Sequence, residues 1–127
     1  MGCGRVGSRL ASMLDQEGHI VTVVDVDSKS FRRLAPSFAG VALVGDGTDE
    51  ETLTSAGAGD AHVFIAVTQG DNRNIMACQI AKEIFHVAKV IARIYDPMRQ
   101  DTFRELGLVT YCPTTVVTNM IHETIEQ

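Results

Sequence analysis

The sequence lacks the features that define several large classes of protein. No apolar run approaches the roughly 18–20 residues that cross a bilayer, so a membrane-spanning helix is excluded. Acidic residues outnumber basic ones, 16 to 11, and the net charge of −5 argues against a nucleic-acid-binding protein. The three cysteines show no CxxC spacing, and no signal-like segment opens the chain. Both absences predict a cytoplasmic protein with reduced thiols.

The composition is that of a folded domain. Apolar residues make up 45% of the chain and charged residues 21%, which excludes a disordered or low-complexity sequence. A length of 127 residues suits one domain of ordinary size. Because no linker or repeat interrupts the pattern, we expect residues 1–127 to form a single domain.

Short apolar runs rich in β-formers alternate with segments of helical spacing. Most runs lack polar alternation, which is typical of parallel strands buried on both faces. Helical stripes lie between them, and Gly18 and Asp71 are placed to end the first helix and to cap the next long one. The expected strands are Ile20–Val24, Val41–Val44, His62–Val67, Lys89–Ile94 and Leu108–Tyr111.

This alternation predicts an α/β fold, a Rossmann-like doubly wound parallel sheet. The strand that should precede the first helix is largely absent, because only Met1 stands before a glycine turn. A doubly wound sheet without its central strand exposes two interior edges, which is an aggregation liability. We therefore expect an N-terminal segment to be missing from this sequence, rather than a new topology.

The opening Gly2-Cys3-Gly4-Arg5-Val6-Gly7 has the spacing GxGxxG. In dinucleotide-binding proteins the first glycine allows a tight turn, the second a close approach to pyrophosphate, and the third close packing of helix on strand. The N–H groups at the start of the following helix then point at the anion. A simple glycine turn is the alternative interpretation.

Asp25 supports the nucleotide interpretation. It ends an apolar run 23 positions after Gly2, near the roughly 20-residue spacing of a ribose-binding acid. A carboxylate there accepts hydrogen bonds from the ribose hydroxyls and, with Asp27, repels a 2′-phosphate. NAD or an adenine nucleotide is thus favoured over NADP. Alternatively, Asp25 is a loop acid that caps a helix at Ser28–Ala35.

Two further loops leave the carboxyl ends of expected strands, where open α/β sheets bind ligands. Gly45–Thr48 can border an adenine ring, or can be a turn in which Thr48 or Asp49 caps a helix. Ala66–Asn74 faces the glycine loop in the usual strand order. Its short polar residues are expected near the distal half of a dinucleotide, where they can hydrogen-bond ribose, phosphate or the loop backbone, or can cap a helix; they are Thr68, Asp71, Asn72 and Asn74.

Arg93 interrupts an otherwise apolar strand. Burying an unpaired arginine is costly, so it requires either a phosphate or a nearby acid. The sequence leaves open a ligand-binding or switching role and a structural ion pair. Arg5 likewise either meets a phosphate or is solvated. No histidine falls in a loop that faces the crevice, and no cluster has metal-ligand spacing.

Together these segments resemble the N-terminal nucleotide-binding domain of the regulators of potassium conductance, also called KTN or TrkA-N domains. The resemblance covers nearly the whole chain, and the combination of GDGT with VT-x-x-DN-x-N is more specific than GxGxxG. The matching segments are GCGRVG at Gly2–Gly7, VVDVD at Val23–Asp27, GDGT at Gly45–Thr48, AVTQGDNRNI at Ala66–Ile75 and IARIYDP at Ile91–Pro97.

The resemblance implies a cytosolic regulatory subunit of a Trk- or Ktr-type potassium uptake system. Such subunits bind NAD(H), ATP or ADP without catalysis, form dimers and then rings, and lie on the inner face of the plasma membrane through the transporter. It implies that Gly2, Gly4 and Gly7 hold phosphates, Asp25 the ribose and Arg5 a terminal phosphate. The remaining implied cofactor residues are Cys3, Val6, Val26, Asp46, Gly47, Thr48, Thr68 and Arg93.

The last segment, residues 113–127, has a wide apolar face. By resemblance, it is predicted to contact a partner subunit; the alternative is a helix packed on its own sheet. The sequence does not extend into the smaller C-terminal domain common in the family, so we expect either a fragment or a regulator of a short kind. Two other functions stay open, an NAD-dependent oxidoreductase fragment and a structural adaptor with an empty crevice.

Overall fold

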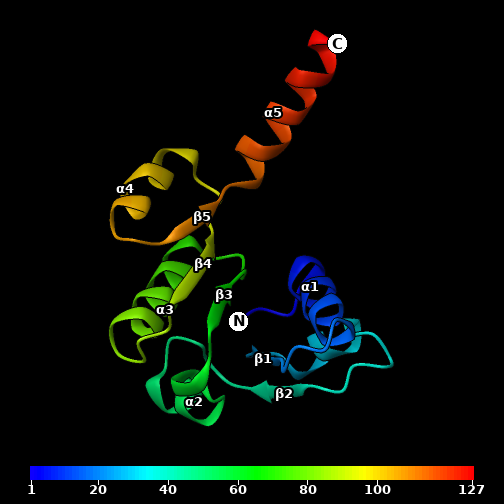
Figure 1. The fold of residues 1–127 in the computed structure, drawn as a ribbon, viewed down its shortest axis with the longest axis vertical. Coiled ribbons are helices and arrows are strands. Elements are labelled where there is room, and N and C mark those ends of the chain that lie inside the picture. Colours follow the sequence, from blue (N-terminus) through cyan, green and yellow to red (C-terminus); the bar gives the residue numbers. More distant parts are fainter.

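The computed structural model describes residues 1–127 and contains five parallel strands in two sheets (Figure 1). β1 (Thr22–Asp25) pairs with β2 (Val41–Val44). β3 (Val63–Ala66), β4 (Lys89–Arg93) and β5 (Val109–Tyr111) form the second sheet, in that order. The predicted α/β fold with parallel strands is confirmed, and each strand lies within two residues of its expected bounds.

The first two residues lie between the two sheets. The amino group of Met1 donates a hydrogen bond to the carbonyl of Ile65 (2.7 Å), and the N–H of Val67 donates to the carbonyl of Met1 (3.0 Å). On the other side, the N–H of Gly2 donates to the carbonyl of Val24 (2.8 Å). Met1 and Gly2 therefore occupy the position of a central strand that is largely absent, as the sequence predicts.

Five α-helices follow or connect the strands (Figure 1). Three 3-10 helices lie at η1 (Ser28–Arg33), Ala58–Asp60 and Pro97–Arg99. The helix expected at Ser28–Ala35 is present as the 3-10 helix η1, whose three-residue turn brings Phe31 and Leu34 onto one face, against the core. The α-helices are α1 (Arg5–Gln16), α2 (Glu50–Ser55), α3 (Asp71–Glu83), α4 (Gln100–Glu105) and α5 (Pro113–Glu126).

One predicted helix end is confirmed and one predicted cap is wrong. Gly18 follows α1 with φ +92°, and the N–H groups of Gly18 and His19 donate to the carbonyls of Asp15 and Leu14, a Schellman ending. Asp71, by contrast, is the first residue of α3 and does not cap it. Its carboxylate accepts the N–H groups that follow β4, a contact between segments about 24 residues apart.

Burial is uneven. A core of nine buried residues lies around β3, β4 and α3, and a second core of three, Cys3, Ala11 and Val23, lies between α1 and β1. The edge strand β2 is largely exposed, with Val41 at 57% and Val44 at 54%, so the expectation of burial on both faces is wrong there.

The helix α5 extends away from the rest of the molecule (Figure 1). None of its residues is buried, so the alternative that it packs on its own sheet is wrong. No helix in the structure has both the length and the apolar character needed to cross a membrane.

Candidate functional site

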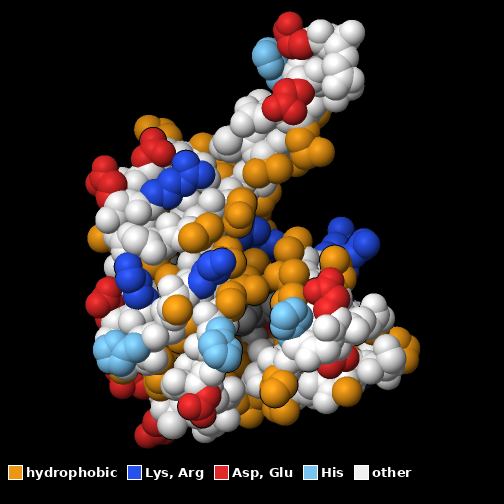
Figure 2. Space-filling model, in the orientation of Figure 1, with side chains coloured by type: hydrophobic (Ala, Val, Ile, Leu, Met, Phe, Trp, Pro, Cys, Tyr) orange, Lys and Arg blue, Asp and Glu red, His pale blue; other side chains and the backbone are white.

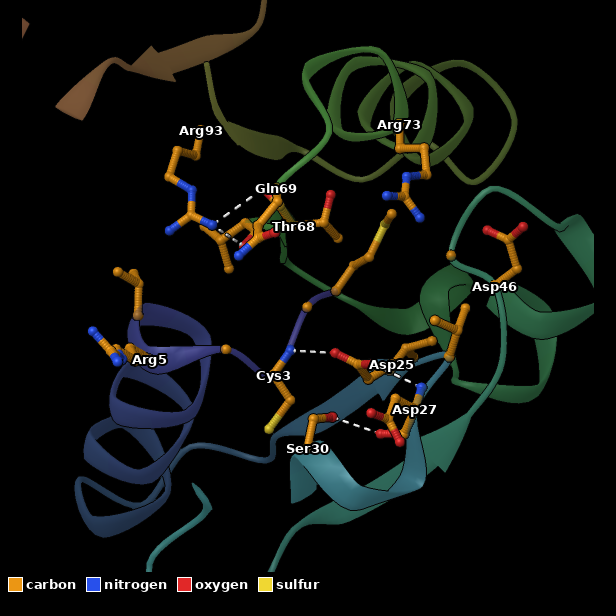
Figure 3. A pocket seen from close by; sticks show the side chains of 18 of the residues that line it. Cys3, Arg5, Asp25, Asp27, Ser30, Asp46, Thr68, Gln69, Arg73 and Arg93 are labelled. Carbon is orange, nitrogen blue, oxygen red and sulfur yellow. Dashed lines mark hydrogen bonds between the residues drawn. The ribbon is translucent and has the colours of Figure 1, made fainter. Parts of the chain in front are cut away.

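A cavity of about 810 Å³ opens where the carboxyl ends of the strands meet (Figure 3). Its lining draws on the ends of four strands, through Asp25 of β1, Gly45 after β2, Val67 after β3 and Arg93 of β4. The volume lies within the range of small-molecule sites. The position is the one at which parallel α/β sheets bind ligands, between the two sheets.

The glycine loop crosses one wall of the cavity and has the geometry that GxGxxG requires. Gly2 turns with φ +97°, which favours glycine. A Cβ on Gly7 would lie 1.9 Å from the carbonyl oxygen of Gly2, so α1 packs directly on the loop. A Cβ on Gly4 would meet nothing within 4 Å, so the space beside Gly4 is open to a ligand. Because Gly4 caps α1 without a side-chain bond, the first N–H groups of this helix remain available to an anion.

Asp25 connects the end of β1 to this loop. One carboxylate oxygen accepts the N–H of Cys3 and the other accepts the N–H of Asp27, both at 2.8 Å. A carboxylate can accept about four hydrogen bonds, so two positions remain for hydroxyl groups of a ligand. The helix cap that the sequence left open for Asp25 is made instead by Asp27, which accepts the N–H of Lys29.

Cys3 turns its side chain away from solvent. Its thiol is fully buried in the smaller core, and burial, followed by the nearby Asp25 carboxylate, raises the pKa of Cys3. The thiol therefore stays protonated at neutral pH. A small residue that fits between two glycines explains this position, and a reactive thiolate does not.

The loop after β2 places Asp46 and Gly47 on the cavity wall. The N–H and hydroxyl of Thr48 donate to one Asp46 oxygen at 2.9 and 2.7 Å, and these bonds lower the pKa of Asp46. Thr48 positions this carboxylate but does not line the cavity. Asp49 caps α2 through the N–H of Glu51, so one of the two caps considered for this turn is present.

The loop after β3 is held by Asn74, which is fully buried. Its side-chain oxygen accepts the N–H and hydroxyl of Thr68, and its amide donates to the carbonyls of Thr68 and Arg93. Thr68 thus lies on the cavity wall in a fixed orientation. Asp71, Asn72 and Asn74 do not line the cavity. Of the contacts that the sequence left open for them, Asn74 makes the one to the loop backbone, and the side chains of Asp71 and Asn72 bind other protein atoms.

The side chain of Arg93 is held by backbone carbonyls and an aromatic ring and not by an acidic side chain. One terminal nitrogen donates to the carbonyls of Val67 (2.6 Å) and Thr68 (3.1 Å), and the guanidinium lies 4.9 Å from the ring centre of Tyr95. The structural ion pair that the sequence left open is therefore wrong. The Nε–H of Arg93 is buried and has no partner, and the side chain lines the cavity. This orphaned donor leaves Arg93 able to bind an incoming anion.

The cavity is lined by charges of both signs. Figure 3 shows Arg5 and Arg93 on one side of it and Asp46 and Arg73 on the other. Four arginines face three aspartates, so an anionic ligand is favoured even though the whole chain is acidic. No histidine lines the cavity, and the structure has no cluster of side chains able to hold a metal ion.

The structure brings most of the predicted site together. Gly7 and Thr48 lie behind the wall, and the residues that line it as predicted are Gly2, Cys3, Gly4, Arg5, Val6, Asp25, Val26, Asp46, Gly47, Thr68 and Arg93. Sequence reasoning missed Ser30, Arg33, Gln69, Arg73 and Tyr95. Tyr95 could have been predicted from the sequence, because side chains two residues apart along an extended chain point to the same side, and Tyr95 follows Arg93 by two residues.

Comparison with known proteins gives one family. The model of the TrkA-N domain matches residues 1–117. A "Trk system potassium uptake protein TrkA" of Streptomyces coelicolor is 53% identical over 110 residues, which are 87% of this chain and 49% of that protein. The chain therefore spans about half the length of that relative.

Two solved structures share the fold. The TrkA-N domain of the inner membrane protein ybaL from Escherichia coli superposes with a TM-score of 0.85 at 19% identity, over 97% of this chain and 91% of that one. A GsuK channel bound to NAD gives a TM-score of 0.72 at 20% identity, over 88% of this chain and 20% of that one.

Proposed function

The chain belongs to the TrkA-N domain family, and we propose that it is the nucleotide-binding module of a cytosolic regulator of potassium uptake. The observation that supports this most directly is the cavity. It combines a glycine loop, the carboxylate of Asp25 at the end of β1, and four arginines. A ligand with both phosphates and vicinal hydroxyls satisfies all three features. NAD(H), ATP and ADP are such ligands.

Each group has a distinct proposed role. Gly2, Gly4 and the first N–H groups of α1 hold phosphates, and Asp25 takes the ribose hydroxyls. Arg5 and Arg93, on one side of the cavity, neutralise the distal phosphates (Figure 3). Asp46 and Gly47 border the adenine. Val6, Val26, Cys3 and Thr68 complete the walls.

The proposed mechanism is regulatory binding. A nucleotide that binds one arrangement of the assembled regulator more tightly shifts the population toward it, whereas equal affinity shifts nothing. The GsuK channel bound to NAD and the potassium-uptake relative support a membrane potassium transporter as the partner, on whose cytoplasmic face the regulator lies. The oxidoreductase alternative needs an acid–base group beside the nicotinamide, and histidine, the most frequent such group, does not line the cavity.

The apolar face of α5 supports assembly with another copy. Apolar side chains are exposed along this helix (Figure 2), which contains no Lys or Arg. Val116, Val117, Met120, Ile121 and Ile125 are 43–73% exposed. We propose that residues 113–127 contact a second subunit. Light scattering of the chain should give a dimer, and Ile121→Asp should give a monomer, with Glu123→Gln as the matched control. A monomer at high concentration in the unmodified chain contradicts this contact.

Thermal melting with single nucleotides tests the ligand. A ligand present at 100 times its Kd stabilises the folded chain by about 2.7 kcal/mol. We expect a rise in Tm with NAD(H) or ATP/ADP and little with NADP, because Asp25 and Asp27 repel a 2′-phosphate. No shift with any of them contradicts nucleotide binding.

An Asp25→Asn variant tests the carboxylate. Removing its charge should raise the affinity for NADP relative to NAD by about tenfold, which corresponds to 1.4 kcal/mol of relieved repulsion. Asp60→Asn is the matched control, because Asp60 is exposed and lies outside the cavity. An unchanged ratio in Asp25→Asn contradicts the role given to Asp25.

A further inference from the structure

Arg73 belongs to the cavity wall, and its side chain has no protein partner. It projects from the first turn of α3, is exposed, and makes no hydrogen bond or ion pair. Figure 3 shows it on the side of the cavity that carries Asp46, away from Arg5 and Arg93. The proposed phosphate contacts of Arg5 and Arg93 therefore leave Arg73 without a role.

Packing places the side chain of Arg73 at the rim of the cavity. The next two residues of α3, Asn74 and Ile75, are buried, so this turn of the helix is held against the protein. A Cβ on Gly70 would lie 3.0 Å from Nε of Arg73 and 3.5 Å from one of its terminal nitrogens. Gly70 has an ordinary φ of −105°, so its missing side chain provides room for the guanidinium rather than a special backbone conformation.

Asp46 presents a hydrogen-bond acceptor on the same side of the cavity. One of its oxygens accepts both the N–H and the hydroxyl of Thr48, and the other makes no bond to protein. The bonds from Thr48, together with the positive charge of Arg73, lower the pKa of Asp46, so its carboxylate is ionised at neutral pH. Asp46 and Arg73 both line the cavity without forming an ion pair, so a ligand group can lie between them.

A neutral base with an amino group fits this pair of side chains better than a phosphate does. The ionised Asp46 repels an anion, whereas the flat guanidinium of Arg73 attracts the face of a planar ring, and an amino group donates to the carboxylate. Figure 3 shows Asp25 between the two sides of the cavity. When Asp25 holds the ribose and the phosphates extend toward Arg5, the base of a nucleotide therefore extends toward Arg73.

We propose that Arg73 is the base-binding residue of the cavity: its guanidinium stacks on the adenine of the bound nucleotide, while the free oxygen of Asp46 accepts the 6-amino group. This inference rests on the proposed nucleotide function and adds the recognition of the base to it. Hypoxanthine carries an oxygen at position 6, which the carboxylate repels and which leaves it without a donor. Adenine nucleotides are thus selected over inosine nucleotides.

A series of nucleotides with one, two and three phosphates separates a base contact from a phosphate contact. Calorimetric titration of the 127-residue chain with AMP, ADP and ATP gives three Kd values for each variant. Arg73→Ala should weaken all three by a similar factor, about fivefold, because the base is common to them. Arg5→Ala should weaken ATP most and AMP least. A loss in Arg73→Ala that grows with the number of phosphates overturns the proposal, because it places Arg73 on the phosphates.

Two further variants test the stacking itself. Arg73→Lys keeps the positive charge without the planar group, so it should lose nearly as much affinity as Arg73→Ala. Arg9→Ala is the matched control, because Arg9 is exposed and lies outside the cavity. Unchanged affinity in Arg73→Lys overturns the proposal, since charge alone then accounts for the contact. An equal loss in Arg9→Ala also overturns it, because the effect then does not depend on the cavity wall.

Inosine diphosphate tests the contact to the amino group. ADP should bind the unmodified chain about tenfold more tightly than IDP, and Asp46→Asn, which can donate to an oxygen at position 6, should remove this preference. Equal binding of ADP and IDP by the unmodified chain overturns the proposal. If no nucleotide binds the unmodified chain, the proposed function fails as well. If the nucleotides bind and Arg73→Ala changes none of the Kd values, only the role given to Arg73 fails.

Discussion

The half of the molecule around β3, β4 and β5 encloses nine buried residues in one core, whereas the half around β1 and β2 encloses three. The first is further tied by Asn74, Lys82 and Gln100, whose side chains bond backbone carbonyls of other elements. In the second, β2 has a largely exposed face. Since local stability follows buried contacts, the β1–β2 half should open at lower free energy.

The glycine loop lies where the two halves meet. Met1 bonds β3, Gly2 bonds β1, and the cavity is walled by both halves. We call the half around β3, β4 and β5 the firmly packed half and the half around β1 and β2 the weakly packed half. A ligand in the cavity therefore contacts both halves. Ligand binding and the order of the β1–β2 half are therefore linked.

Gly7→Ala should cause the largest loss of folding stability, because it pushes α1 away from the glycine loop that joins the two halves. The new Cβ would lie 1.9 Å from the Gly2 carbonyl oxygen, so backbone must move. We expect about 3 kcal/mol of destabilisation in urea unfolding, at the upper end of overpacking effects. Gly4→Ala is the control, since its Cβ meets nothing within 4 Å. Equal stability of the two variants would contradict the close packing at Gly7.

Asn74→Ala should weaken the firmly packed half by about 2–3 kcal/mol. It leaves the N–H of Thr68 and the carbonyl of Arg93 buried without their partner. Asn72→Ala is the matched control, because Asn72 is exposed and bonds only Arg99 at the surface. Chemical denaturation should show a change within about 0.5 kcal/mol for the control. A similar small change for Asn74→Ala would show that this network does not hold the loop.

Acidification should lower the folding stability through the Met1 amino group, which lies where the two halves meet. Its pKa falls from 8.0 to about 6 on folding, because burial disfavours the charged form. Between these values the unfolded chain binds more protons, so stability is fully present above pH 8 and is lost as pH falls toward 6. The loss between pH 8 and pH 6 should be about 2 kcal/mol.

An N-terminally acetylated chain is the control for this titration. Acetylation removes the ionisable group, so the stability change assigned to Met1 should disappear from its pH profile. Superimposable profiles of the two chains would place the titrating group elsewhere.

His86→Gly should produce the smallest effect, and a stabilising one, in the firmly packed half. His86 follows α3 with φ +56°, the only positive value among non-glycine residues, and its side chain is exposed. Glycine relieves this conformation, with an expected gain of about 0.5–1 kcal/mol in urea unfolding. His62→Gly, at an exposed position before β3, should bring no gain. A loss at His86 would mean that its side chain makes a favourable contact.

Much of the fold and of the cavity was predictable from local pattern. Apolar runs located all five strands, and glycine spacing located the loop, because both signals depend on neighbouring residues. Asp25 was predictable since it ends such a run. Asp71 was misjudged because its carboxylate binds backbone about 24 residues away, a tertiary contact that outweighs helix capping. Arg33 and Arg73 were missed because helical residues reach the cavity only through the packing of η1 and α3.

Native-state hydrogen exchange with and without NAD tests whether a nucleotide in the cavity links the less stable half around β1 and β2 to the more stable half around β3, β4 and β5. Without nucleotide, the amides of β1 and β2 should exchange faster than those of β4. With NAD at 100 times its Kd, exchange in β1 and β2 should slow about 100-fold, whereas NADP at the same concentration should have little effect. Equal exchange in the two halves, or exchange in β1 and β2 that NAD leaves unchanged, would contradict the account.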